Sequence, residues 1–320
     1  MSEIKFSTRL NSFALGKGKK YPSGEESAVE LIKIAGLVEG LTSLEINYPE
    51  HFHSNSVEEI KAAAIEAGLS IEGIQIRWPA PEFSNGGFTN PDPDVRAQAV
   101  QLVKEAVDIC RKFDVSHVLL WPAHDGYEYP MQMDYVEAWS NQIQCLQEIS
   151  DYAKEIRVSI EFKPAEPRGR TILNNTASVM KMLDDVNREN IGATLDLGHM
   201  LMARENPAQS AALALRDGKL WGVQLNDSHG AADDGLVVAS LHMPETLELI
   251  YYLIRYEYKG TFYFDTDPVR ESPVAECEMN IRRIKHFIEL AESMLLEKGG
   301  EPNGDALRGS ELVWKKLIGK

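Results

Sequence analysis

The sequence predicts an α/β protein built as a single (β/α)8 barrel. Short apolar segments rich in β-branched residues alternate eight times with segments whose apolar residues recur at helical spacing. This alternation is typical of βαβ units around a parallel sheet. The 320 residues, 43% of them hydrophobic, provide enough chain and core for eight such units. We expect the barrel to cover residues 1–295, and the Gly-rich residues 296–320 to form a polar C-terminal tail.

The strands and helices are expected in strict alternation. The strands are expected at residues 4–13, 41–48, 70–78, 115–121, 158–161, 191–197, 220–225 and 261–264. The helices are expected at residues 26–38, 57–67, 96–113, 135–156, 176–186, 208–215, 245–256 and 274–295. Glycines such as Gly40 and Gly68 close helices, and the Pro-containing segments 79–95 and 122–134 are long loops.

Composition excludes several classes of function. The chain has 49 acidic and 33 basic residues, for a formal net charge of −16. Nucleic-acid and anionic-membrane binders need a basic face, so neither partner is expected. No apolar run approaches the roughly 20 residues of a membrane span. The chain has an odd number of cysteines, and they are widely spaced: Cys110, Cys145 and Cys277. This pattern indicates free thiols in a reducing compartment, so we expect a cytoplasmic protein.

Four consecutive predicted strands end in side chains that can bind a cation. These are Glu161, Asp196, Gln224 and Asp265, and Lys163 and His199 follow the first two. In a barrel these strand ends share one rim, and neighbouring strands lie about 4.8 Å apart. Oxygen ligands without thiolates suit Mn²⁺ or Mg²⁺, with Co²⁺ as an alternative. We therefore predict one divalent ion bound by Glu161, Asp196, Gln224 and Asp265.

A salt bridge at the barrel rim explains any one of these acids equally well. Glu161, for instance, could pair with Lys163 or Arg168. The salt-bridge explanation is less convincing for the whole set, because four consecutive strands end in a residue that can bind a cation. Two loop histidines, His124 and His229, are further candidates for proton transfer or substrate binding, with an exposed loop histidine as the alternative for each.

Several motifs resemble those of the xylose isomerase-like barrel superfamily. IEFKPAEPRG at residues 160–169 resembles its EPKPNEPRG motif, and DLGH at 196–199 resembles ETGH. VQLNDSHG at 223–230 is similar to IDLNGQHG, and the resemblance continues in order from about residue 70 to 295. The superfamily contains aldose–ketose isomerases, ketose 3-epimerases, inosose dehydratases and C-glycoside deglycosidase catalytic subunits. A DNA-repair endonuclease of the related three-zinc barrel is a third alternative, which the net charge of −16 and the scarcity of histidines at the strand ends disfavour.

The resemblance implies a role for each matching residue. Glu161, Asp196 and Asp265 would bind the metal, with Gln224 where the family has aspartate. The expected catalytic residues are Glu161, Lys163, Asp265, His124 and His199. The expected substrate-binding residues are Trp121, Glu166, Arg168, Asn226 and His229. Gly235 stands where the family has the second aspartate of a D-x-D pair, so one ion is expected instead of two.

These residues together predict an enzyme. The expected activity is a divalent-metal-dependent sugar isomerase or epimerase that converts an unphosphorylated sugar through a metal-bound enediolate. The alternative is a lyase on the same scaffold, of the inosose dehydratase or C-glycoside deglycosidase type. A homo-oligomer is expected, and the long loops leave room for a small partner subunit.

Overall fold

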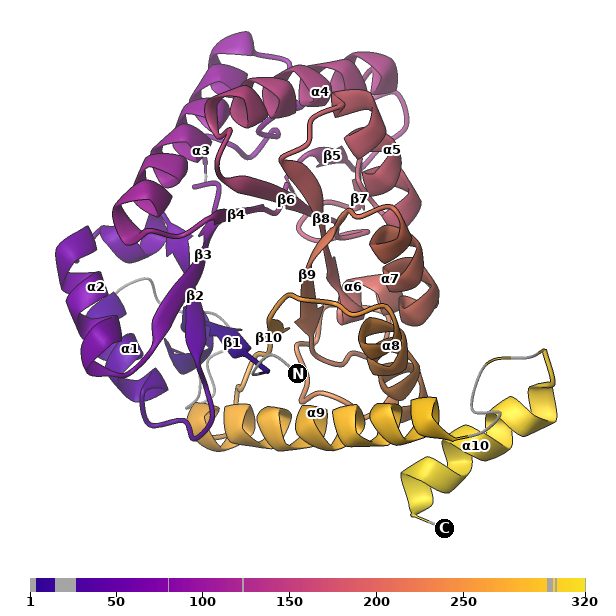
Figure 1. The fold of residues 1–320 in the computed structure, drawn as a ribbon. Coiled ribbons are helices and arrows are strands. Elements are labelled where there is room, and N and C mark those ends of the chain that lie inside the picture. The colour runs from indigo at the N-terminus through magenta and orange to yellow at the C-terminus, as the bar shows by residue number, and fades with distance from the viewer. Residues whose placement is uncertain are drawn as a thin grey trace.

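The structure, a computed structural model, describes residues 4–14, 27–79, 81–122, 124–297, 302 and 304–319. Within them eight parallel strands close into one barrel in the order β1-β10-β9-β8-β6-β4-β3-β2. Helices surround the ring of strands (Figure 1). The barrel strands are β1 (Phe6–Arg9), β2 (Ser43–Tyr48), β3 (Ser70–Ile76), β4 (His117–Leu120), β6 (Arg157–Glu161), β8 (Ile191–Asp196), β9 (Leu220–Leu225) and β10 (Phe262–Phe264). The predicted (β/α)8 fold is therefore confirmed.

A helix follows each strand on the outside of the barrel. These helices are α1 (Ala28–Ala35), α2 (Val57–Glu66), α3 (Pro93–Phe113), α4 (Tyr135–Tyr152), α5 (Thr176–Val186), α7 (Pro207–Arg216), α8 (Met243–Arg255) and α9 (Pro273–Leu296). Their starts carry the expected capping residues: the Asp134 side chain accepts from two backbone N–H groups of α4, and Ser56 and Glu59 form a capping box on α2.

Several short elements depart from the expected boundaries. β1 ends at Arg9, and the rest of the expected first strand forms the 3-10 helix η1 (Leu10–Ala14). A second 3-10 helix, η2 (Glu50–Phe52), follows β2, and α6 (Leu197–Met202) begins directly where β8 ends. Two loop segments, β5 (Gly126–Tyr127) and β7 (Arg170–Thr171), pair in an antiparallel ribbon.

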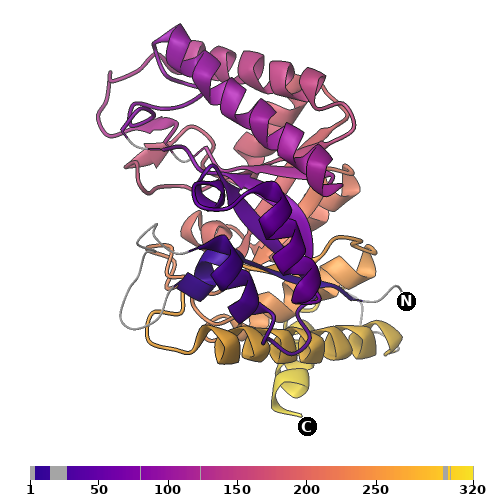
Figure 2. The same ribbon diagram turned by 90° about the vertical axis from the view of Figure 1, so that its left-hand side faces the viewer.

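The expected C-terminal tail contains a helix. Residues 306–318 form α10 (Ala306–Ile318), which extends away from the barrel beyond the end of α9 (Figures 1 and 2). Its apolar residues Leu312, Val313 and Leu317 pack against the main core, whereas Leu307 and Trp314 are exposed. In sequence the segment looks polar because glycines and charged residues flank these few apolar positions.

The barrel interior is polar, and the apolar core lies between the strands and the helices. In β2 the apolar Leu44 and Ile46, both fully buried, alternate with Ser43, Glu45 and Asn47. Polar side chains from several strands line a small internal cavity of about 40 Å³; among them are Ser7, Glu45, His117, Thr194, Gln224 and Tyr263. A polar interior lets the strands carry charged groups up to the barrel end.

Two expectations from composition concern the cysteines and the membrane. Cys110, Cys145 and Cys277 are buried and form no disulfide. Among the described helices, none combines the length and the apolar character that crossing a bilayer requires.

Gly222 tests how tightly the barrel is packed. A Cβ atom at Gly222 would lie 2.5 Å from Oγ1 and 3.0 Å from Cγ2 of Thr194 on the neighbouring strand. We predict that Gly222→Ala lowers the free energy of unfolding by about 1–3 kcal/mol, because the buried strands cannot separate to admit a methyl group. The control is Gly309→Ala in α10, where a Cβ atom meets nothing within 4 Å. Equal effects in urea denaturation would contradict this packing argument.

Candidate functional site

Three buried groups converge at the carboxyl end of the barrel. Glu161 is the last residue of β6, Asp196 is the last residue of β8, and His199 lies in the first turn of α6. One potential ligand atom from each lies within 4.8 Å of the others. Their exposed fractions are 2%, 0% and 2%. Two carboxylates and an imidazole so close together and so deeply buried are arranged as metal ligands are.

The Asp-Leu-Gly-His turn fixes the position of Asp196. Its Oδ1 accepts the backbone N–H of His199 at 2.9 Å, and its Oδ2 accepts the Nδ2 amide of Asn226 at 2.9 Å. Oδ1 of Asn226 in turn accepts the N–H of Gly198 at 2.8 Å. A Cβ atom at Gly198 would lie 2.9 Å from Oδ1 of Asn226, so glycine makes room for this contact. Asn226 thus orients the carboxylate of Asp196.

Glu161 faces two groups that could share a cation with it. Nδ1 of His199 lies 3.1 Å from Oε1 of Glu161, without the alignment of a hydrogen bond. The terminal amide of Gln224 lies 3.2 and 3.3 Å from the two carboxylate oxygens. With its nitrogen turned toward Glu161, this amide donates to the carboxylate. With its oxygen turned there, the oxygens face one another as they do around a bound cation.

The site holds protons tightly when no cation is present. Burial raises the pKa of Glu161, and it raises the pKa of Asp196 to about 8. Burial alone would lower the pKa of His199, but Asp196, Asp233 and Glu161 together raise it well above its usual range. The three groups titrate as a coupled set. A cation that binds them must therefore displace protons.

Asp233 reaches into the site from the loop that follows β9. Its Oδ2 lies 3.0 Å from Nζ of Lys163 and 3.3 Å from Nε2 of His199. Nζ of Lys163 also lies 3.1 Å from Oε2 of Glu166. Burial raises the pKa of Asp233, but His199 and Lys163 outweigh this effect and lower it. Lys163 is thus held at the mouth by two acids.

Asp265, predicted as a metal ligand, lies beside the cluster and contacts an arginine. Its Oδ1 accepts from Nη1 of Arg9 at 2.8 Å, and Nη2 of Arg9 lies 2.8 Å from Asp267. Asp265 raises the pKa of both Glu161 and Asp196, so its charge is felt in the cluster. It is not one of the three residues whose ligand atoms converge. Its role as a ligand stays a prediction.

An aromatic wall stands next to Lys163. Trp121 directly follows β4, and Nζ of Lys163 lies 5.4 Å from its ring centroid. The guanidinium carbon of Arg77, which directly follows β3, lies 5.0 Å from the same ring. Cations at this distance from an indole face are attracted by its π electrons. The Trp121 ring and the cationic ends of Lys163 and Arg77 therefore lie next to one another.

Three other predicted site residues show no contact with the cluster among the described interactions. Arg168 donates from Nε to the carbonyl of His124 at 3.1 Å and pairs with Glu128 at 2.9 Å, so it ties two loops together. Burial, and then Arg168, lower the pKa of the His124 side chain. His229 is exposed, and its backbone N–H donates to Asp234. Roles in substrate binding or proton transfer remain predictions for all three.

Sequence reasoning missed Arg9 and Arg77 and did not place Asp233. Both arginines sit at strand ends, Arg9 as the last residue of β1 and Arg77 as the first after β3. Examining the first four strand ends as closely as the last four would have found them. Asp233 lies in a loop, and no local pattern shows that this loop folds back over Lys163.

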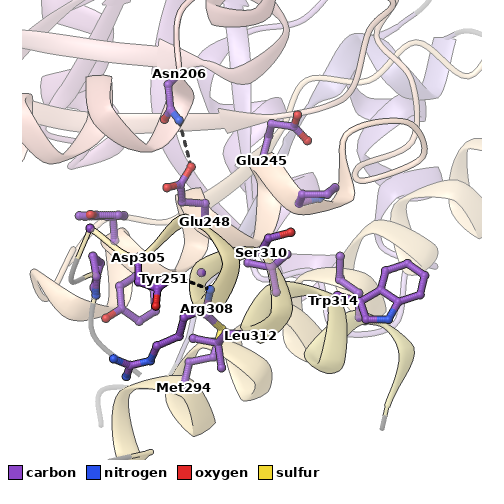
Figure 3. Close-up of a pocket in the computed structure, with 17 residues that line it drawn as sticks. Asn206, Glu245, Glu248, Tyr251, Met294, Asp305, Arg308, Ser310, Leu312 and Trp314 are labelled. Carbon is purple, nitrogen blue, oxygen red and sulfur yellow. Dashed lines mark hydrogen bonds between the residues drawn. The ribbon is translucent and has the colours of Figure 1, made fainter. Parts of the chain in front are cut away.

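A cavity of about 650 Å³ lies away from this site. It lies between α8 and α10 (Figure 3). Tyr251, Leu312 and Trp314 line it together with a few separated polar groups such as Glu248, which accepts from Asn206. Among the residues that the structure describes, no group of three or more acids, histidines or cysteines converges there. We therefore take the barrel mouth as the candidate functional site.

Comparisons with known proteins find xylose isomerases among the relatives of this chain. A xylose isomerase from Thermus thermophilus is 28% identical over 229 residues, which covers 69% of this chain and 59% of that protein. One from Thermus caldophilus is 28% identical over 221 residues, covering 67% and 57%. The chain thus spans less than two thirds of the length of these relatives.

Solved structures show the same fold. An L-ribulose 3-epimerase superimposes with a TM-score of 0.74 at 16% identity, covering 94% of this chain and 100% of that one. A D-psicose 3-epimerase from Clostridium cellulolyticum H10 gives 0.69 at 18% identity, with coverage of 89% and 99%. The family described as xylose isomerase-like TIM barrel matches residues 37–255. This match spans more than half of the sequence, so the chain belongs to the xylose isomerase-like TIM barrel family.

Proposed function

We propose that this protein is a sugar isomerase or epimerase that depends on one divalent ion and acts on an unphosphorylated sugar. The observation that carries the proposal is the buried cluster of Glu161, Asp196 and His199 at the barrel mouth. In this fold the carboxyl ends of the strands hold the active site. The names of the relatives, xylose isomerase and ketose 3-epimerases, favour the same class of reaction.

The residues at the mouth fit a divalent ion of the Mn²⁺ or Mg²⁺ class. Glu161 and Asp196 offer anionic oxygens, and Gln224 can turn an amide oxygen toward Glu161. Asp265 keeps Oδ2 available, because Arg9 binds its Oδ1. The described cysteines lie elsewhere in the core. An ion bound there would supply positive charge to stabilise the negative charge that develops on substrate oxygens.

The chain's own residues account for binding and proton transfer. Trp121 offers an apolar face for the C–H side of a sugar, and Lys163 beside it can donate to a substrate carbonyl or hydroxyl. Glu161 is the proposed base that removes the proton next to the carbonyl and generates an enediolate. His199, which contacts Glu161 and Asp233, is its proposed partner acid.

The loop after β9 favours proton transfer over hydride transfer. Lys163 and His199 hold Asp233, the nearest acid of this loop to the site. Gly235 occupies the position of the second family aspartate, and a Cβ atom there would lie 2.8 Å from Oδ2 of Asp267. A carboxylate pair for a second ion is therefore incomplete, and a mechanism that needs one ion fits this loop better.

Turnover in D₂O tests the proposed reaction. We predict that protein loaded with Mn²⁺ converts at least one member of a panel of aldoses, ketoses, inososes and 3-keto-glycosides, and that the product carries solvent deuterium on the reacting carbon. Glu161→Gln should lower turnover by about 10²-fold or more, because the base and a metal ligand are lost together. Glu289→Gln, an exposed change on α9, is the control. Deuterium-free product would contradict proton transfer, and an elimination product would indicate a lyase.

Metal binding should depend on pH. Without the ion, the raised pKa values of Glu161 and Asp196 mean that these carboxyl groups still hold protons near neutral pH. Binding must release them, so affinity for Mn²⁺ should rise as the pH increases through about 6 to 8. Calorimetry in buffers of different ionisation enthalpy measures the protons released. Pure uptake of metal with no proton release across this range would contradict the charge assignment.

A further inference from the structure

Most of the cations at the barrel mouth are neutralised by acids. Arg9 contacts Asp265 and Asp267, each at 2.8 Å. Lys163 contacts Asp233 at 3.0 Å and Glu166 at 3.1 Å. Arg77 differs, because no acid of the described residues forms an ion pair with it within 4.0 Å. Its positive charge at the mouth is therefore available to a ligand.

Arg77 is held in place by contacts that leave most of its donors free. Its backbone N–H donates to the carbonyl of Tyr48 at 2.9 Å, which extends the β2–β3 pairing by one residue. Its Nη2 donates to Oε1 of Gln75 at 3.3 Å, and its guanidinium carbon lies 5.0 Å from the Trp121 ring centroid. A guanidinium has five N–H donors in a planar fork. One hydrogen bond and one aromatic contact orient the guanidinium and leave its other N–H groups free to bind a ligand.

Glu50 is within electrostatic reach of Arg77 but has other partners: burial raises its pKa, and His51, Asn47, Arg77 and Asn11 together lower it. The Glu50 carboxylate accepts the Asn11 amide at 3.0 Å and the Asn47 amide at 2.9 Å. Arg77 lowers the pKa of Glu161, although burial and the neighbouring acids leave that pKa raised. The guanidinium is thus within electrostatic reach of the candidate metal centre, on the side of Trp121.

We propose that Arg77 binds a carboxylate of the substrate, so that the substrate of this site is a sugar acid. This inference rests on the proposed function for the position of the reacting sugar, and it adds the substrate class. The planar guanidinium matches a carboxylate in a bidentate pair, and the Trp121 face excludes water from one side of it. One unpaired arginine balances one carboxylate. A phosphate group carries a charge of about −1.5 to −2 and would need a second free cation, whereas Arg9 and Lys163 are already paired.

Binding measurements on the metal-loaded protein test this proposal. The probes are D-glucuronate and D-galacturonate, each compared with its neutral counterpart, D-glucose or D-galactose, and with glucose 6-phosphate. We expect at least one uronate to bind tenfold or more tightly than its neutral counterpart in calorimetry. Arg77→Gln should remove this preference, and Arg77→Lys should keep part of it because the charge remains. Arg216→Gln, on the exposed end of α7 beside Asp217, is the charge-matched control and should keep the full preference.

Three results would overturn the proposal. They are equal binding of uronate and neutral sugar, a uronate preference that persists in Arg77→Gln, and a preference for glucose 6-phosphate. Absence of measurable uronate binding would overturn the proposal in the same way as equal binding of uronate and neutral sugar. Metal content and circular dichroism of each variant show whether the change acts through folding or through loss of the ion. If uronates bind through Arg77 but no sugar is converted, the proposed reaction fails and the anion site stands.

Discussion

The burial of several carboxylates at one end of the barrel is the constraint on which the rest of this structure depends. An uncompensated charge in a protein interior costs several kcal/mol, so each acid needs hydrogen bonds, a counterion or a proton. Asp196 receives the Asn226 amide and a helix N–H, and Arg9 neutralises Asp265. Glu161 has no lysine or arginine within ion-pairing distance among the described residues and faces only Gln224 and His199. A bound cation would resolve that imbalance.

The same constraint explains local features of the fold. α6 starts on Asp196 itself, so the strand end and the helix N-terminus both hold the carboxylate. The loop after β9 is fastened by the fully buried Asp227, which pairs through its backbone with Leu236 and accepts the N–H groups of Leu241 and His242. These contacts of Asp227 hold the loop in a conformation in which Asp233 reaches Lys163 at the barrel mouth. Lys163, His199 and Asp233 are therefore brought together by segments that follow three different strands, β6, β8 and β9.

Much of the barrel could be predicted from local sequence, because each strand and helix has its own apolar pattern and capping residues. Glu161 and Asp196 were predictable for the same reason, since each ends a buried strand. The partners of the acids were not, because they come from distant parts of the chain: Arg9 and Asp265 are separated by 256 residues. The β5–β7 ribbon has two residues in each strand, too few to form a pattern. Helix α10 was missed because the segment that contains it is rich in glycine and charged residues.

The central claim is that the barrel mouth is a metal centre, and crystallography of Mn²⁺-loaded protein with anomalous scattering tests it most directly. We expect one anomalous peak, within about 2.0–2.6 Å of carboxylate oxygens from both Glu161 and Asp196. The Gln224 amide oxygen should turn toward the ion. A well-ordered mouth in which no anomalous peak touches Glu161 or Asp196 would contradict the account, because their charges would then be balanced by protons and His199 alone.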